Sequence, residues 1–170
     1  FGVKFSPGAF YSLFRVSPAP FLGKDVPLGK ALGGMSALFS GVGKCSDADE
    51  MRARLDGILL PLAEKRERLC PQIDAVIKEI YASRGCARTS ALAEKAGWSE
   101  RWLAGMFAKW TGATPGIFCA NVKFCLAMME MIRDKAQISV AAEAGYSDQA
   151  HLNRTFRARV GRRPSTYFRK

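Results

Sequence analysis

The chain has few of the residues on which catalysis and metal binding depend. Its 170 residues include one histidine, His151, and only 15 acidic side chains against 26 basic ones. No cluster with the ligand spacing of a metal site can be formed, and no nucleophile has a base within reach. Paired carboxylates and a phosphate-binding loop are also absent. We therefore expect no metal, no cofactor and no enzymatic activity.

Cysteine and long apolar runs are also sparse. The five cysteines are odd in number and form no CxxC pair, which favours free thiols in an intracellular protein over a disulfide framework. No run of eighteen apolar residues and no secretory signal pattern is present, so we expect no membrane span. Because the chain begins at Phe1 without methionine, we expect a fragment of a longer, cytoplasmic protein.

Positive charge, by contrast, is in excess and lies mainly toward the carboxy terminus. The net charge is +11, and the larger share falls after Arg66. The last seventeen residues hold no acidic side chain and seven basic ones: Arg154, Arg157, Arg159, Arg162, Arg163, Arg169 and Lys170. Such a concentration attracts a phosphate backbone. Because these arginines are interleaved with a predicted helix, they favour nucleic acid over a membrane as the partner.

One sequence pattern occurs twice. The first copy is Ala96-Gly97-Trp98-Ser99 followed by Leu103, Phe107, Gly112, Pro115 and Phe118. The second is Ala144-Gly145-Tyr146-Ser147 followed by Leu152, Phe156, Gly161, Pro164 and Tyr167. An alanine precedes each first glycine by four residues, at Ala93 and Ala141. A repeat this specific indicates a shared supersecondary unit.

The residue types of the repeat suit a helix-turn-helix. A small alanine lets two helices approach, glycine takes a left-handed turn, and the serine caps the next helix. Leucine and phenylalanine four residues apart then face the core, and the second glycine ends the helix. The second copy has one more residue in its turn or in the first turn of its helix. A solenoid-type hairpin repeat is the alternative, disfavoured because there are only two copies in different surroundings.

The remaining pattern predicts a mainly all-α fold of two helix-turn-helix subdomains joined by a long linking helix. These would occupy residues 90–112 and 138–160, with the linking helix at 115–133 and a further helix from Ile73 to near Gly85. Before them we expect a small, mostly helical remnant with one or two short strands. Its elements are a strand over Gly2–Phe5, a helix carrying Phe10 to Phe14, a helix over 28–39 weakened by Gly33-Gly34, and a helix begun by a Ser46/Asp49 capping box and broken near Pro61.

Residues from about Ile73 onward resemble the DNA-binding domain of the AraC/XylS family of bacterial transcription regulators. The second repeat, from Val140 to Arg157 and closing with Gly161 and Pro164, follows the family signature almost without interruption. The segment with Gly2-Val3-Lys4-Phe5-Ser6-Pro7-Gly8-Ala9 and Val26-Pro27-Leu28 resembles the end of the amino-terminal effector-type domain of one branch. The resemblance implies two domains: residues 1–66, the end of that domain with a linker helix, and residues 71–170, the DNA-binding domain.

The resemblance also implies where DNA binds. Recognition helices place their first turns in the major groove, where side chains pair with base edges. The expected base-reading residues are Gln149, Ala150, Asn153 and Arg154 in the second repeat and Arg101, Ala104 and Gly105 in the first. The expected phosphate contacts are Ser99, Trp102, Lys109, Ser147, Arg157, Arg159, Arg162 and Arg163.

Three features depart from the family pattern or stay open. Ala104 and Gly105 stand where relatives carry long polar side chains, so the first helix is expected to read shape, thymine methyls and phosphate, or else to serve only in packing. After Ala127 the usual leucines are replaced by Glu130 and Met131, and another by Gln137, which allows a one-residue phase shift in the linking helix. His151 is either a hydrogen-bonded residue at the turn or a DNA contact.

The sequence thus favours a sequence-specific transcription regulator. A linking helix of nineteen residues would measure about 28 Å, near the spacing of about 34 Å between successive major grooves on one duplex face. One chain could therefore place two helices in adjacent grooves. RNA polymerase is an expected partner, and a small-molecule effector could act through the amino-terminal domain. The alternative is an architectural DNA-binding protein with little sequence preference.

Overall fold

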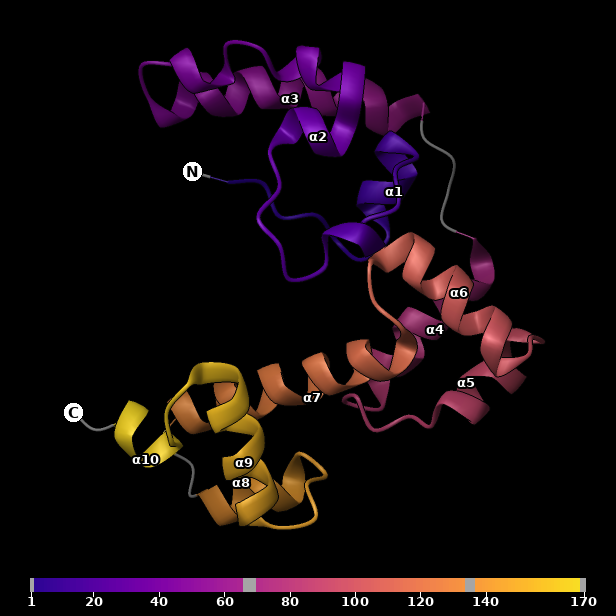
Figure 1. The fold of residues 1–170 in the computed structure, drawn as a ribbon, viewed down its shortest axis with the longest axis vertical. Coiled ribbons are helices and arrows are strands. Elements are labelled where there is room, and N and C mark those ends of the chain that lie inside the picture. Colours follow the sequence, from indigo (N-terminus) through magenta and orange to yellow (C-terminus); the bar gives the residue numbers. More distant parts are fainter. Residues whose placement is uncertain (1, 66–69, 134–136, 169–170) are drawn as a thin grey trace. The chain divides into compact units, whose positions relative to one another are not determined.

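A computed structural model describes residues 2–65, 70–133 and 137–168 (Figure 1). Within these ranges all regular elements are helices, which confirms the mainly all-α prediction. They are α1 (Ala9–Phe14), η1 (Ala19–Phe21), α2 (Leu28–Leu32), η2 (Gly33–Phe39), η3 (Val42–Lys44), α3 (Ala48–Lys65), α4 (Pro71–Ala82), α5 (Thr89–Ala96), α6 (Glu100–Thr111), α7 (Pro115–Ile132), α8 (Gln137–Glu143), α9 (Gln149–Val160) and α10 (Pro164–Tyr167). The letter η marks a 3-10 helix.

The described chain forms two compact units. One combines the residues up to 75 with residues 96–115, and the other combines residues 76–95 with those from 116 onward. Helix α6 therefore belongs to the same unit as the front segment, by which we mean residues 2–65. The domain limits expected from the sequence stay a prediction, and Arg66 lies outside the described residues.

In the first unit, α1 packs against α6. The Tyr11 ring meets the Trp110 ring edge-on, with 4.7 Å between the ring centroids. At the end of α6, Gly112 has a φ of +90°, and a Cβ placed on it would lie 3.3 Å from the Cβ of Pro18. Glycine suits this position because it takes a left-handed conformation and leaves room for the proline. These contacts join the front segment to the predicted first recognition helix.

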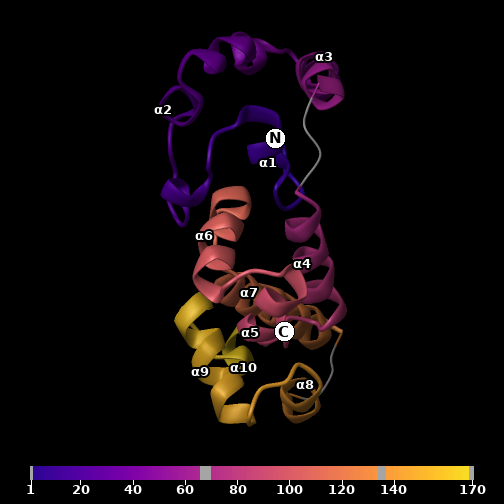
Figure 2. The same ribbon diagram turned by 90° about the vertical axis from the view of Figure 1, so that its right-hand side faces the viewer.

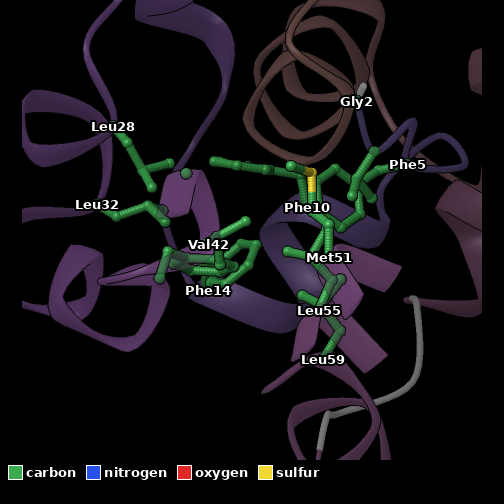
Figure 3. Close-up of a pocket in the computed structure, with 13 residues that line it drawn as sticks. Gly2, Phe5, Phe10, Phe14, Leu28, Leu32, Val42, Met51, Leu55 and Leu59 are labelled. Atoms are coloured by element: carbon green, nitrogen blue, oxygen red, sulfur yellow. The ribbon is translucent and has the colours of Figure 1, made fainter. Parts of the chain in front are cut away.

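The first unit also contains an apolar cavity of about 510 Å³ (Figure 3). Figure 3 shows Phe10 and Phe14 of α1 among the side chains that surround it, together with Met51 and Leu55 of α3. Among the described residues that line the cavity, none carries a charge. Helix α1 thus has two faces, one at this cavity and one against α6.

In the second unit, α8, α9 and α10 gather at one end of α7 (Figure 1), and they also lie close together in the second view (Figure 2). Their common core is made of buried residues from all but the last of these helices and from the turn between α8 and α9: Ala127, Met131, Val140, Ala141, Ala144, Tyr146, Leu152 and Phe156. The alanines and the leucine–phenylalanine pair of the second repeat therefore face inward, as predicted. Tyr146 seals the turn, where Gly145 has a φ of +69°.

The end of α4 lies directly against the backbone of α7. Gly85 has a φ of +80°, and a Cβ on it would lie 2.4 Å from the carbonyl oxygen of Cys119 and 2.8 Å from the amide nitrogen of Lys123. Contacts this short exist only where no side chain is present. Gly85 therefore sets the distance between this turn and α7.

Several local predictions are wrong. Gly2–Phe5 form no strand, since the described chain offers no strand with which they could pair. The capping box of α3 is displaced by one residue: the amide of Glu50 donates to Asp47 Oδ1 at 2.8 Å, and the amide of Ser46 donates to the Glu50 carboxylate. Helix α3 also continues through Pro61, which lacks the N–H that would bond to the carbonyl four residues earlier.

Candidate nucleic-acid interface

The first recognition helix, α6, begins as the repeat predicts. Ser99 Oγ accepts a hydrogen bond from the amide of Trp102 at 3.2 Å, and Gly97 in the preceding turn has a φ of +68°. Leu103 and Phe107 are fully buried. The sequence thus fixes which face of α6 is buried, and with it which face is available for a ligand.

The second recognition helix, α9, begins differently from the prediction. Ser147 is not its cap, because Asp148 Oδ1 accepts from the amide of His151 at 2.6 Å. The extra residue of the second copy therefore lies in the turn. Leu152 then follows Asp148 by four positions, as Leu103 follows Ser99. Both caps place the core leucine at the same phase of the helix.

His151 makes the contacts expected of a hydrogen-bonded residue at the turn, and its alternative role as a DNA contact stays a prediction. Its Nδ1 lies 3.2 Å from Ser147 Oγ. Its ring packs against the Tyr146 ring in a T-shaped arrangement, with 5.2 Å between the ring centroids and an angle of 82° between the ring planes. Ser147 in turn donates to Asp148 Oδ2 at 3.2 Å. The histidine therefore braces the turn that leads into α9.

The outward face of α9 is centred on Ala150, Arg154 and Arg157, which are exposed. Gln149 and Asn153 are half-buried, so they lie at the side of this exposed stripe and not at its centre. The Oδ1 atom of Asn153 is buried and has no hydrogen-bond partner among the described residues. The base-reading roles expected for Gln149, Ala150, Asn153 and Arg154 stay predictions, and Arg154 is the one long side chain among these four that is exposed.

The outward face of α6 is short of long polar side chains. Arg101 and Gly105 are exposed, Ala104 is half-buried, and the Trp102 ring is 58% exposed. Further along, Lys109 is exposed but holds its ammonium 5.4 Å from the centroid of the Tyr11 ring. The end of α6 that carries Lys109 is therefore engaged with the front segment, while its first turns are open.

Arg159, in the last turn of α9, differs from Arg162 and Arg163, which follow the helix. The Arg159 guanidinium donates to Asn121 Oδ1 at 2.6 Å and lies over the Phe124 ring at 5.0 Å, both residues of α7. Arg162 and Arg163 are exposed and follow Gly161, which ends the helix with a φ of +80°. Only the latter two resemble arginines available to a phosphate, so a phosphate role for Arg159 would require it to leave α7.

Lys123 provides a contact that the sequence did not suggest. Its ammonium donates to the carbonyl oxygen of Gly145 and lies 4.6 Å from the centroid of the Tyr146 ring. A Cβ on Gly145 would lie 2.8 Å from Cys86 Sγ, so the turn is also closed from a second side. The turn of the second repeat is therefore fixed to α7.

The linking helix keeps a core position despite its altered sequence. Ala127 and Met131 are buried in the core of the second unit, so the methionine fills a core position for which the family pattern predicts leucine. Glu130 is half-buried, and its carboxylate pairs with Arg133 at 3.6 Å. The rest of the predicted phase shift concerns residues 134–136 and the side chain of Gln137, which lie outside the described residues.

The Asp148 cap predicts a pH dependence. The backbone hydrogen bond from His151, followed by the hydrogen bond from Ser147, lowers the pKa of Asp148 from its ordinary value of 3.8. Because the pKa is lower in the folded state than in the unfolded state, the ionised carboxylate stabilises the fold at a pH above the unfolded-state value. This stabilisation is lost as the pH falls through the folded-state pKa. We expect Asp148→Asn, which still caps the helix, to lose this part of the acid dependence in thermal unfolding. Identical acid profiles for the two proteins would contradict the prediction.

Helix α7 needs a separate remark because of its composition. By length and composition alone it could cross a membrane, and it is the single such helix in the described part of the chain. Its residues Val122, Ala127 and Met131 are nevertheless buried in the protein, and Lys123 is bound to the turn before α9. One face of α7 is thus packed in the core, while Ile117, Met129 and Ile132 of the same helix are exposed.

Comparison with known proteins agrees with this geometry. A family model described as a helix-turn-helix domain, of the AraC type, matches residues 92–170. Searches of curated proteins and of solved structures find no match to the chain. Within the described residues no group of three metal-ligating side chains is found. Residues 92–170 are therefore similar to the AraC-type helix-turn-helix domain, a DNA-binding domain family of transcription regulators.

Proposed function

We propose that the protein is a sequence-specific transcription regulator that inserts α6 and α9 into successive major grooves of one duplex. The observation that carries the proposal is that the two helices have the same construction. Each begins with a side-chain cap, buries a leucine and a phenylalanine at the same phase, and ends at a left-handed glycine. The two helices therefore share one scaffold, although their outward faces carry different side chains.

The length of α7 supports simultaneous contact. The helix has eighteen residues, which at about 1.5 Å per residue gives a rod of about 27 Å. Successive major grooves on one face of a duplex lie about 34 Å apart. The length of α7 is comparable with this spacing, which supports the proposal that one chain contacts two adjacent half-sites.

Arg154 is our candidate for direct base reading by α9. It is exposed on the outward stripe, and arginine pairs with the O6 and N7 atoms of guanine. Gln149 and Asn153 flank it and have amide groups suited to adenine. Arg162 and Arg163 would hold the backbone, because they are exposed and lie just beyond the helix.

The test is selection of bound sequences from a random duplex pool, followed by affinity measurements against salt. We expect Arg154→Ala to relax specificity at one base pair by about 1–3 kcal/mol. Arg163→Ala should weaken all sequences alike and lower the salt slope by about one. Arg159→Ala is the contrast, since its contacts with α7 predict a loss of stability and an unchanged slope.

The alternative, a low-specificity architectural protein, predicts another outcome. Its support is the net charge of +11 and the lack of long side chains at Ala104 and Gly105. If Arg154→Ala lowers the affinity for selected and random DNA equally, and no motif emerges from the pool, base reading by α9 is excluded. A motif with two blocks spaced by one helical turn supports both helices, and a single block supports α9 alone.

The proposed regulator would act in the cytoplasm and contact RNA polymerase, as the family resemblance implies. For an effector, the cavity of about 510 Å³ in the front segment has the size of a small-molecule site. Helix α1 lines this cavity with Phe10 and Phe14 and meets α6 through Tyr11. Occupation of the cavity could therefore influence α6 through a single short helix.

A further inference from the structure

The first turns of α6 carry a hollow that the proposed function does not yet use. It has a volume of about 280 Å³ and is lined by Ser99, Arg101, Trp102, Gly105 and Met106. Residue 105 is a glycine, and a Cβ built on it would meet nothing within 4 Å, so there is open space beside the backbone at this point. Its floor is thus the bare backbone of the helix, on the face that is open to a ligand.

The walls of the hollow are mostly apolar. The Trp102 ring remains 58% exposed, although a ring of this size gains much from burial. Met106 is half-buried beside it. Arg101 is exposed and supplies the one positive charge among the lining residues. The apolar walls suit an apolar group of the ligand, and the neighbouring Arg101 suits a ligand that is negatively charged as a whole.

The major groove offers one apolar group on its base-pair edges, the C5-methyl of thymine. Hydrogen-bonded base reading is excluded at Ala104 and Gly105, whose side chains have no polar atom. We infer that the hollow on α6 receives the C5-methyl and adjoining edge of a thymine, with Trp102 and Met106 in contact with the methyl. The inference rests on the proposed insertion of α6 into the major groove and specifies what α6 reads there.

The inference also changes the meaning of the sequence departure at Gly105. A long side chain at this position would fill the hollow and hold the methyl away. Glycine costs about 1 kcal/mol of helix propensity relative to alanine, and here it leaves space at the DNA-facing side. The specificity of α6 would then come from shape and apolar contact and not from hydrogen bonds.

The test replaces each thymine of a selected duplex, one at a time, by deoxyuridine, which lacks only the methyl group. We expect one position under α6 to lose about four-fold in affinity, the value of one buried methyl group. Replacing that thymine by cytosine should also lower the affinity. Replacing the cytosine by 5-methylcytosine, which carries the C5-methyl again, should restore part of this loss. Thymines under α9 provide an internal comparison on the same DNA.

Two variants connect the effect to the hollow. Gly105→Ala partly fills it while favouring the helix, and Trp102→Ala removes a wall; both should bring the thymine-to-uracil ratio at that position near one. Gly57→Ala in α3, where a Cβ also meets nothing, is the matched control and should leave the ratio unchanged. Gly105→Ala and Trp102→Ala should leave the thymine-to-uracil affinity ratios at positions under α9 unchanged.

The outcomes separate this inference from the proposed function. If a motif is selected but no thymine under α6 responds to uracil, the inference is overturned and sequence-specific binding stands. The same holds if the response survives in both Gly105→Ala and Trp102→Ala. If the pool yields no motif, the proposed function fails and the inference fails with it.

Discussion

Replacing Phe156 by alanine is expected to lower the free energy of unfolding of the second unit by about 3–5 kcal/mol, the range for large aromatic side chains removed from a core. Phe156 is 0% exposed. Its ring lies 5.8 Å from Phe124, 5.6 Å from Tyr167 and 5.8 Å from Phe168, measured between centroids. The substitution therefore removes one ring from an aromatic cluster that joins α7, α9 and the end of the described chain.

Chemical denaturation followed by circular dichroism measures this loss. Tyr167→Ala is the matched control because it removes a ring of the same cluster that is 50% exposed, and we expect a much smaller effect. DNA affinity of Phe156→Ala should fall together with the folded fraction. Equal losses of stability in the two variants would contradict the assignment of Phe156 to the centre of the core.

The second large effect is expected for Gly85→Ala. The added Cβ would lie 2.4 Å from the Cys119 carbonyl oxygen, and the residue would keep a φ of +80°. A left-handed conformation costs a non-glycine residue about 1–2 kcal/mol, and overpacking costs about 1–3 kcal/mol. We therefore expect a loss of about 2–5 kcal/mol in the free energy of unfolding, because the obstacle is backbone that cannot rotate away.

The same substitution elsewhere should act in the opposite direction. Gly57 lies inside α3, and a Cβ there meets nothing within 4 Å. Gly57→Ala should stabilise the helix by up to about 1 kcal/mol. If Gly85→Ala is tolerated as well as Gly57→Ala in thermal unfolding, the close approach of the turn after α4 to α7 is wrong.

The sequence predicted the parts of this fold that depend on local chemistry. Left-handed turns at Gly97 and Gly145, the cap at Ser99 and the buried leucine–phenylalanine pairs all follow from residue type and spacing. The aromatic residues after each proline also pack back, Phe118 on Tyr81 and Tyr167 on Phe156. Such features need only a few neighbouring residues, so one sequence suffices to predict them.

Contacts between distant residues could not be predicted in this way. Neither the pairing of Arg159 with Asn121 nor that of Lys123 with the carbonyl of Gly145 leaves a pattern in the sequence. The sequence allowed a cap at Asp148, because aspartate caps helices as well as serine does. The choice between the adjacent Ser147 and Asp148 depends on the path of the turn. The candidate site was therefore predicted by helix and face more reliably than by individual side chain.

The packing of α1 on α6 has a practical consequence for anyone dividing this chain. A DNA-binding fragment started at the beginning of α4 would follow the domain limit suggested by the sequence, yet it would leave behind Tyr11 and Pro18. Trp110 and Gly112 would then face solvent where they now contact the front segment. Such a fragment would gain an uncovered aromatic patch beside its first recognition helix, and with it a tendency to self-associate. The shortest well-behaved piece of this protein is thus longer than its family domain.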